Sequence, residues 1–198
     1  MNIDSDLNAQ INVAEWIDEN LSIPYLFDNE NERWSHTCFD LAVEHHAAVI
    51  SLCKQSLYGS ALSLLRIEFE ALVRGLWLRH VASENEIKKF KKDKVDPRFY
   101  KLIEAIEGKV GIKEGLLSYI KDNQWNIFNS FTHTGIEAVS RRIGKKTTGY
   151  ENYQQTDVVN ALRFSGLVAV LAAVELASIS KKQEVVDSAM AFANDYGK

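Results

Sequence analysis

The sequence predicts an all-α fold, a single-domain helical bundle of about six to eight helices that spans residues 1–198. Apolar residues recur at helical spacing along the whole chain, whereas the alternating pattern of a β-strand is scarce. Only 2 Pro and 10 Gly interrupt the chain, which is typical of long regular elements with few turns. A chain of this length buries roughly 70% of its unfolded surface, which favours a single core.

Capping signals and breaks in the periodicity divide the chain into eight predicted helices. Thr37 with Asp40 and Ser83 with Glu86 have the spacing of capping boxes. The Asp96–Pro97 step is a further start signal, for the helix that follows it. The helices cover residues 4–20, 36–57, 59–82, 84–92, 98–108, 113–143 with a break near Asn123, 156–180 and 182–195.

Two polar stretches lie between predicted helices or at their ends. KKFKKDK, residues 88–94, holds five lysines that could contact a phosphate backbone, but a solvated charged connection is the commoner explanation of such a run. GKKTTGYENYQQT, residues 144–156, is predicted as a surface loop before the long penultimate helix. Neither stretch indicates a domain boundary.

Composition limits the classes of function. The formal net charge of -4 and a pI near 5.8 give no overall attraction for polyanions, which argues against a general DNA-binding protein. Cys38 and Cys53 have neither metal-type spacing nor a disulfide framework, and MNIDSDLNAQ lacks a signal-peptide pattern, so we expect a cytoplasmic protein. The longest apolar run, FSGLVAVLAAV at residues 164–174, is well short of the ~20 residues that cross a bilayer, so no membrane contact is expected.

Three charged residues lie beside large apolar side chains in LLRIEFEALVRGLWLRH, residues 64–80. Arg66, Glu70 and Arg74 follow at four-residue steps and run from within the apolar face of the predicted helix to its edge. Isolated burial of a charge costs several kcal/mol, so these groups must pair or line a cavity. Both a structural Arg66–Glu70 pair and a ligand or catalytic cleft fit this pattern. The opposite side of the helical wheel carries Glu68, Gly75 and Arg79.

A second polar stripe lies in NQWNIFNSFTHTGIEAVSRRIG, residues 123–144. Asn129, His133 and Ser140 line the border of an apolar face, on which Gly135 would let another helix or a ligand approach closely. The apolar face consists of Ile127, Phe128, Phe131, Gly135, Ala138 and Val139. The candidate substrate-binding residues are Asn129, Thr132, Thr134, Arg141 and Arg142.

His133 is the better candidate for acid–base chemistry because hydrogen-bond donors are concentrated around it within three helical turns. The alternative is a hydrogen-bonded structural histidine. If the two apolar faces pack together, the two stripes meet, and Arg66 or Glu70 comes within hydrogen-bond reach of Asn129 or His133.

The other histidines do not indicate a metal site. His45 and His46 are adjacent on a predicted helix, so their side chains point about 100° apart. No Glu-x-x-His spacing accompanies them, and no Gly-rich phosphate loop, nucleophile elbow or zinc-type motif occurs. We therefore expect neither a metal nor a cofactor.

Together the two stripes resemble an uncharacterised bacterial family of small all-helical proteins. The resemblance rests on LLRIEFEALVRGLWL, followed some fifty residues later by FNSFTHTGIEAVSRR, and spans most of residues 60–180. That family is similar to the broad HEPN-like class, whose helical bundles often dimerise and whose active members are metal-independent endoribonucleases of toxin–antitoxin and antiphage systems. The resemblance implies an HEPN-like bundle with RNA as a partner, together with a cognate antitoxin or defence partner.

The HEPN signature is an arginine followed four to six residues later by a histidine, typically with a polar residue after the arginine. The sequence offers Arg74 and His80 in RGLWLRH, with Gly75 in place of the polar residue. Arg74 and His80 point about 120° apart on a helical wheel, so His133 is a second candidate for the imidazole.

The resemblance implies acid–base cleavage by the RNA 2′-hydroxyl, in which His133 or His80 removes or supplies a proton. Glu70 then orients an arginine. The arginines that would hold phosphate are Arg66, Arg74 and Arg141.

A non-catalytic helical module is the alternative, with the same stripes binding a small ligand or a partner helix. A homodimer is also expected, because small and apolar side chains surround much of the circumference of FSGLVAVLAAVELA. The dimer contact would be the helix over residues 164–174. Central burial of that helix within one subunit is the competing explanation.

Overall fold

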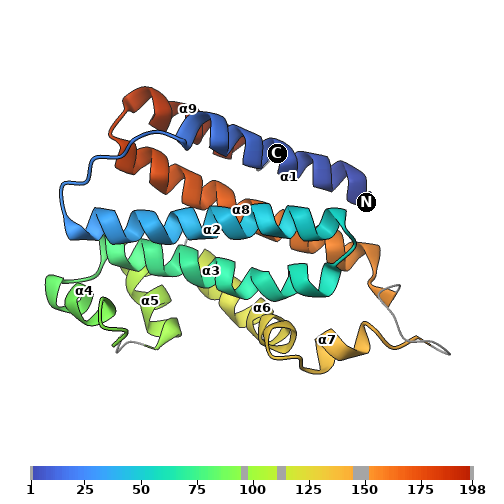
Figure 1. Cartoon of the computed structure of the whole chain (residues 1–198). Coiled ribbons are helices and arrows are strands. Elements are labelled where there is room, and N and C mark those ends of the chain that lie inside the picture. Colours follow the sequence, from blue (N-terminus) through green and yellow to red (C-terminus); the bar gives the residue numbers. More distant parts are fainter. Residues whose placement is uncertain (1, 95–97, 111–114, 145–151, 197–198) are drawn as a thin grey trace.

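The computed structural model describes residues 2–94, 98–110, 115–144 and 152–196, which form an all-α helical bundle (Figure 1). This confirms the predicted fold class. The helices are α1 (Ile3–Leu21), α2 (Glu30–Lys54), α3 (Tyr58–His80), α4 (Glu84–Phe90), α5 (Phe99–Val110), α6 (Leu116–Thr132), α7 (Ile136–Ser140), α8 (Gln155–Ser180) and α9 (Gln183–Tyr196).

Helices α2, α3 and α8 form the centre of the bundle, and each packs against the other two. Helices α1 and α9 cover α8 on one side, whereas α5 and α6 cover α3 on the other (Figure 1). The central helices are therefore covered on more than one side.

Helix α8 contains the apolar run of residues 164–174. It is long and apolar enough to cross a bilayer by length and composition alone, but 61% of its most apolar 18-residue window is buried inside the bundle. Its apolar circumference is used within one subunit, by contacts with α1, α2, α3 and α9. Central burial, the competing explanation for this helix, accounts for the composition.

The start of α2 differs from the prediction. The helix begins at Glu30 because the side chain of Asn29 accepts a hydrogen bond from the backbone N–H of Glu32 at 2.9 Å. Thr37 lies inside the helix and donates to the carbonyl of Trp34, so the predicted capping box of Thr37 with Asp40 is wrong. The other predicted capping box, Ser83 with Glu86, is confirmed at the start of α4.

The predicted helix over residues 113–143 is interrupted later than expected. Asn123 lies within α6, and the chain instead turns after His133, where Thr134 has a φ of 55°. A Cβ atom at Gly135 would lie 2.6 Å from the hydroxyl oxygen of Ser130, so the turn requires glycine there. Gly135 thus serves this turn rather than the approach of a ligand, and α7 leaves the line of α6.

The short helix α7 does not continue the predicted apolar face. Phe128 and Phe131 of α6 are buried, whereas Ile127 of α6 is 40% exposed and Val139 of α7 is 41% exposed, so the predicted apolar face is only partly buried. The Asp96–Pro97 step and most of residues 144–156 lie outside the described residues.

A buried polar network joins the three central helices. Ser165 Oγ of α8 lies 2.9 Å from Glu68 Oε1 of α3 and 2.8 Å from His46 Nδ1 of α2, and His46 Nε2 lies 3.4 Å from the carbonyl oxygen of Gln10. Ser165, Glu68 and His46 have no exposed surface. The side of α3 opposite Arg66 is therefore not solvent-facing, because α2 and α8 both cover it.

Burial decides the ionisation of this network. It raises the pKa of Glu68 well above its usual value, and it lowers the pKa of His46 to about 4. His46 is thus neutral near pH 7, and burial favours the neutral form of Glu68, because a charge in the interior is costly. The second carboxyl oxygen of Glu68 has no hydrogen-bond partner among the described residues.

The two shifts affect stability in opposite directions. His46 binds a proton more readily in the unfolded chain than in the folded one. The contribution of His46 to the free energy of unfolding is therefore lost as the pH falls from about 6.5 towards 4. Glu68 holds its proton more tightly in the folded chain. The contribution of Glu68 to the free energy of unfolding is therefore lost as the pH rises above the pKa of Glu68 in the unfolded chain, near 4.5.

We expect Glu68→Gln to become more stable relative to the wild type as the pH rises from 5 to 8, because the amide does not titrate. The slope of the difference should approach about 1.4 kcal/mol per pH unit until the pH reaches the folded pKa of Glu68. Urea unfolding at several pH values measures it, with the exposed Glu104→Gln as the control. A pH-independent difference would show that Glu68 titrates normally in the folded protein.

Close packing of α3 against α2 yields a second prediction. A Cβ atom at Gly75 would lie 2.5 Å from a ring carbon of buried Phe39, so Gly75→Ala should lower the free energy of unfolding by about 1–3 kcal/mol. Gly108→Ala in α5 is the matched control, because its Cβ meets no atom within 4 Å, and it should raise stability by about 0.5–1 kcal/mol. Equal effects in thermal or urea unfolding would contradict this packing.

Candidate functional site

Hydrogen bonds between side chains and the backbone fasten the end of α6 to the first half of α3. Ser63 Oγ donates to the carbonyl of Phe131 at 3.1 Å, and Thr132 Oγ1 lies 3.4 Å from the carbonyl of Ser63. The next residue, His133, ends α6 as its C-cap. Its ring therefore lies beside Arg66, one turn further along α3 than Ser63.

Arg66 is the centre of a cluster of four side chains, which we call the Arg66 cluster: Arg66, Glu70, Trp125 and His133. Arg66 Nε donates to Glu70 Oε1 at 2.9 Å, and Arg66 Nη1 lies 2.7 Å from His133 Nε2. The guanidinium carbon lies 4.9 Å from the centre of the Trp125 ring. The predicted meeting of the two polar stripes is confirmed.

The hydrogen bonds determine where the imidazole carries its proton in this arrangement. A guanidinium can only donate, so His133 Nε2 must accept, and the ring proton is on Nδ1. Arg66 uses only two of its five N–H groups on Glu70 and His133. One positive and one negative charge balance within the cluster.

The Arg66 cluster is open to solvent on one side. The side chains of Arg66 and Glu70 are each 22% exposed, and His133 is exposed. Water or a ligand can thus reach the imidazole and the edge of the guanidinium. The ion pair is neither sealed in the core nor fully solvated.

The aromatic ring of Trp125 lies against one face of the Arg66 guanidinium. Trp125 stacks on Phe99 of α5 with ring centres 4.7 Å apart and an interplanar angle of 18°. Cation–π contact with Trp125 holds the plane of Arg66 in place. Sequence reasoning missed Trp125, although its spacing to Asn129 and His133, four residues at each step, places all three on one side of α6.

Asn129 lies between Trp125 and His133 on α6. Its side-chain oxygen is buried and has no hydrogen-bond partner among the described residues. Thr134, another predicted binding residue, is exposed at the turn.

Arg74 and His80 do not meet in one cluster. His80 Nε2 lies 3.1 Å from Glu175 Oε2 of α8, and the same carboxylate is 3.3 Å from Arg79 Nε. No hydrogen bond or ion pair of Arg74 is found within the described ranges. Its charge instead acts on Cys38 of α2, where burial raises the thiol pKa to about 11 and Arg74 opposes that rise.

The remaining predicted arginines lie near the start of α8. Arg141 Nε donates to Asp157 Oδ2 at 2.8 Å, and Arg141 Nη1 lies 3.4 Å from Glu137. Two carboxylates thus already bind the guanidinium of Arg141, which leaves fewer of its N–H groups for a phosphate. Arg142 is exposed and lies near Gly59 at the start of α3.

The candidate metal ligands are not grouped. In the part of the chain that the structure describes, no three His, Cys, Asp or Glu side chains are arranged to hold a metal ion. His46 is inside the buried network, whereas the adjacent His45 is only partly buried.

One family model matches the chain over residues 39–198, a range that includes the whole Arg66 cluster and the buried network. Its description is a family of unknown function, DUF6988. No curated protein and no solved structure matches the chain. The match omits α1 and the first nine residues of α2.

The exposure of the Arg66–Glu70 pair leads to a stability prediction. Glu70→Ala should lower the free energy of unfolding by about 1 kcal/mol, because solvent and two further contacts still stabilise the guanidinium. Urea unfolding measures the loss, with Glu137→Ala in the more exposed Glu137–Arg141 pair as the control. A loss of about 3–5 kcal/mol would instead indicate a sealed ion pair.

Proposed function

The chain belongs to the DUF6988 family of unknown function, and for this member we propose metal-independent cleavage of RNA at the Arg66 cluster. The observation that carries the proposal is the 2.7 Å contact between Arg66 and His133 at a solvent-open junction of α3 and α6. A cation for phosphate and an imidazole for proton transfer are thus adjacent. The HEPN-like resemblance of the sequence adds to this proposal.

Binding of a phosphodiester would change the partner of Arg66. The N–H group that now bonds His133 is directed to a phosphate oxygen, which is the stronger acceptor because it is charged. His133 Nε2 is then released as a free lone pair next to the bound phosphate. Substrate binding therefore creates the general base.

The reaction needs only RNA as a reactant. His133 removes the proton from a 2′-hydroxyl, the 2′-oxygen forms a bond to phosphorus, and the bond from phosphorus to the 5′-oxygen breaks. The imidazolium then gives its proton to the departing 5′-oxygen. The products are a 2′,3′-cyclic phosphate and a 5′-hydroxyl, while Arg66 stabilises the negative charge that develops on the phosphate.

The other members of the cluster hold these two groups in position. Glu70 fixes Arg66 from one side, and Trp125 supports the plane of the guanidinium. Arg74 and His80 match the HEPN spacing but lie further along α3, where His80 pairs with Glu175 and Arg74 is not part of that pair. His133 contacts an arginine whereas His80 contacts Glu175, which favours His133 as the acid–base group beside a phosphate-binding cation.

A non-catalytic binding module is the second candidate. One observation favours it: the N–H groups of Arg66 that neither Glu70 nor His133 uses can donate to a ligand without displacing His133. Under this alternative the same surface binds a small ligand or a partner helix and no bond is cleaved.

The cellular setting of the proposal follows from the resemblance. We place the protein in the cytoplasm, in a toxin–antitoxin or antiphage system with a cognate antitoxin or defence partner. A homodimer remains part of the proposal, but α8 is largely buried within one subunit and leaves little surface for the contact.

Removal of the imidazole should abolish cleavage. Purified wild type, incubated with single-stranded RNA and EDTA, is expected to yield fragments with 2′,3′-cyclic phosphate ends. His133→Ala should lower the rate by a factor of about 100 or more, which is the usual contribution of a general acid or base. Gel analysis of end-labelled RNA measures the rate, and urea unfolding verifies the fold of each variant.

His80→Ala is the matched control, because it tests the imidazole of the HEPN spacing. It should retain cleavage if His133 is the acid–base group. Loss of activity in His80→Ala with full activity in His133→Ala would move the site to the other end of α3. Intact RNA with the wild type would overturn the enzymatic proposal in favour of the binding module.

A further inference from the structure

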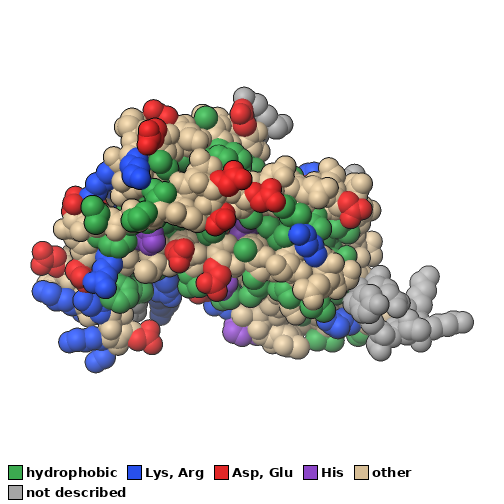
Figure 2. All heavy atoms as spheres, turned by 45° about the horizontal axis from the view of Figure 1, so that its top comes forward, with side chains coloured by type: hydrophobic (Ala, Val, Ile, Leu, Met, Phe, Trp, Pro, Cys, Tyr) green, Lys and Arg blue, Asp and Glu red, His purple; other side chains and the backbone are tan. Residues whose placement is uncertain are grey.

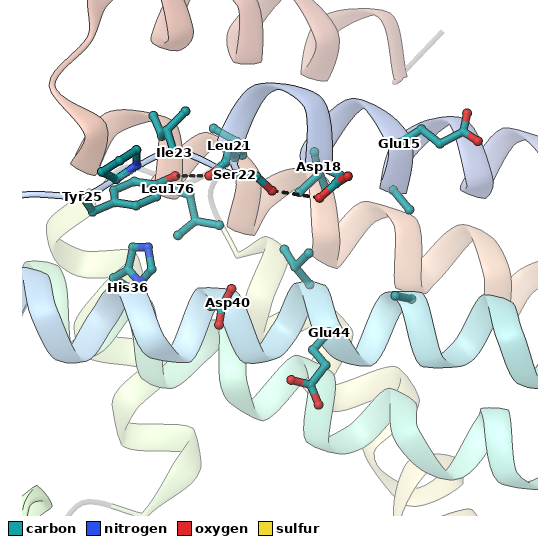
Figure 3. Close-up of a pocket in the computed structure, with 15 residues that line it drawn as sticks. Glu15, Asp18, Leu21, Ser22, Ile23, Tyr25, His36, Asp40, Glu44 and Leu176 are labelled. Atoms are coloured by element: carbon teal, nitrogen blue, oxygen red, sulfur yellow. Dashed lines mark hydrogen bonds between the residues drawn. The ribbon is translucent and has the colours of Figure 1, made fainter.

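A separate hollow lies between α1 and α2 (Figure 3). Helix α1 lies on the side of the bundle away from α6 (Figure 1). The volume of the hollow is about 830 Å³, and Leu176 of α8 contributes to its lining. Ile17 and Leu21 of α1 and Val43 of α2 give it an apolar surface. We call this hollow the α1–α2 groove.

Acidic side chains line both sides of the α1–α2 groove. Asp18 of α1 and Asp40 of α2 lie on its two sides, whereas the carboxylates of Glu15 and Glu44, one turn further towards one end, point away from the space between the two helices (Figure 3). All four are exposed residues. Acidic side chains also gather across the middle of the face that Figure 2 shows, with hydrophobic groups among them.

The four groove carboxylates are not paired within the described part of the chain: unlike Glu30, which pairs with Lys91, they form no ion pair with Lys or Arg there. Among them, Asp18 accepts a hydrogen bond from the hydroxyl of Ser22 at 2.8 Å. The groove therefore concentrates negative charge that the protein itself leaves unbalanced.

An aromatic pair closes the opposite end of the groove. Tyr25 and His36 meet edge to face with ring centres 4.3 Å apart, and Tyr25 donates to the carbonyl of Leu21 at 3.2 Å. Burial raises the pKa of Tyr25 to about 12 and lowers the pKa of His36. Both rings are thus neutral near pH 7 and contribute no positive charge to the groove.

We propose that the α1–α2 groove binds an organic polycation, specifically a linear aliphatic polyamine. Ammonium groups match the carboxylates on the two sides, and the methylene chain matches the apolar surface between them. The aromatic end offers ring faces to a terminal ammonium group. The binding site is independent of the Arg66 cluster and of the proposed RNA cleavage.

Size favours a small molecule over a partner helix. The volume of the groove lies within the range of roughly 300–1,000 Å³ for small-molecule sites. Its wall on α2 runs from His36 to Ala47, about 16 Å at the rise of an α-helix, which suits an extended polyamine. An inserted helix with side chains is about 10–12 Å wide and would need a larger hollow.

Isothermal titration calorimetry of the full chain with spermidine tests the proposal. We expect saturable binding that weakens about tenfold or more in the double variant Asp18→Asn with Asp40→Asn, which removes one carboxylate from each side of the groove. The matched control is Glu104→Gln with Glu184→Gln, which removes two exposed carboxylates elsewhere and should leave the affinity within twofold of the wild type. An equal loss of spermidine affinity in both double variants would indicate a general effect of net charge and would overturn the proposal.

Two further titrations test whether the groove prefers an organic polycation to a monoamine or a metal cation. Cadaverine should bind more tightly than pentylamine, because it carries an ammonium group at each end, and MgCl₂ at equal ionic strength should not displace spermidine. Displacement by Mg²⁺, or the absence of any saturable heat with spermidine, would contradict a polyamine site. Tight binding of a basic amphipathic peptide with none of spermidine would replace it with a peptide-docking surface.

Discussion

The buried hydrogen bonds of Glu68, Ser165 and His46 constrain the rest of the bundle. A carboxyl group with no exposed surface is tolerated only where a donor meets it, and Ser165 provides that donor. The network therefore fixes the rotation of α3 about its own axis. Two residues earlier, Arg66 lies about 160° around the helix from Glu68, so the same rotation directs it towards α6.

Helix α3 carries polar groups on several sides, and neighbouring helices contact them. Glu68 meets α8, Arg66 meets the end of α6, and His80 meets Glu175 of α8 near the other end of the helix. The close approach of α2 at Gly75 leaves little space for rearrangement on that side. The exposed surface of α3 is thus limited, and the Arg66 cluster occupies part of it.

Periodicity predicted the helices well because it depends on which face each helix buries. Local chemistry was less predictable: Asn29 with Glu32 starts α2, although Thr37 with Asp40 has the same spacing of residue types. The turn at Thr134 depends on a left-handed backbone conformation that the apolar pattern does not record.

The meeting of Arg66 with His133 was predictable, because each residue borders an apolar face and the two faces pack together. The burial of Glu68 was not predictable from the sequence. A helical wheel drawn for α3 alone cannot show that α2 and α8 cover the side of α3 opposite Arg66. The α1–α2 groove was missed for a related reason. Its carboxylates are separated in sequence and become neighbours only when α1 and α2 lie on α8 (Figure 3). The Arg66 cluster and the groove have opposite charge preferences and lie on different sides of the central helices.

The central claim is that RNA phosphate binds Arg66 and displaces His133. Nuclear magnetic resonance of ¹⁵N-labelled protein, titrated with an RNA oligonucleotide whose 2′-hydroxyls are methylated, tests it without cleavage. We predict saturable shifts of the Arg66 Nε–H, the Trp125 indole N–H and the His133 ring nitrogens, with no change at Tyr25 or His36. Saturable shifts confined to other residues, or a spectrum unchanged by RNA, would contradict the claim.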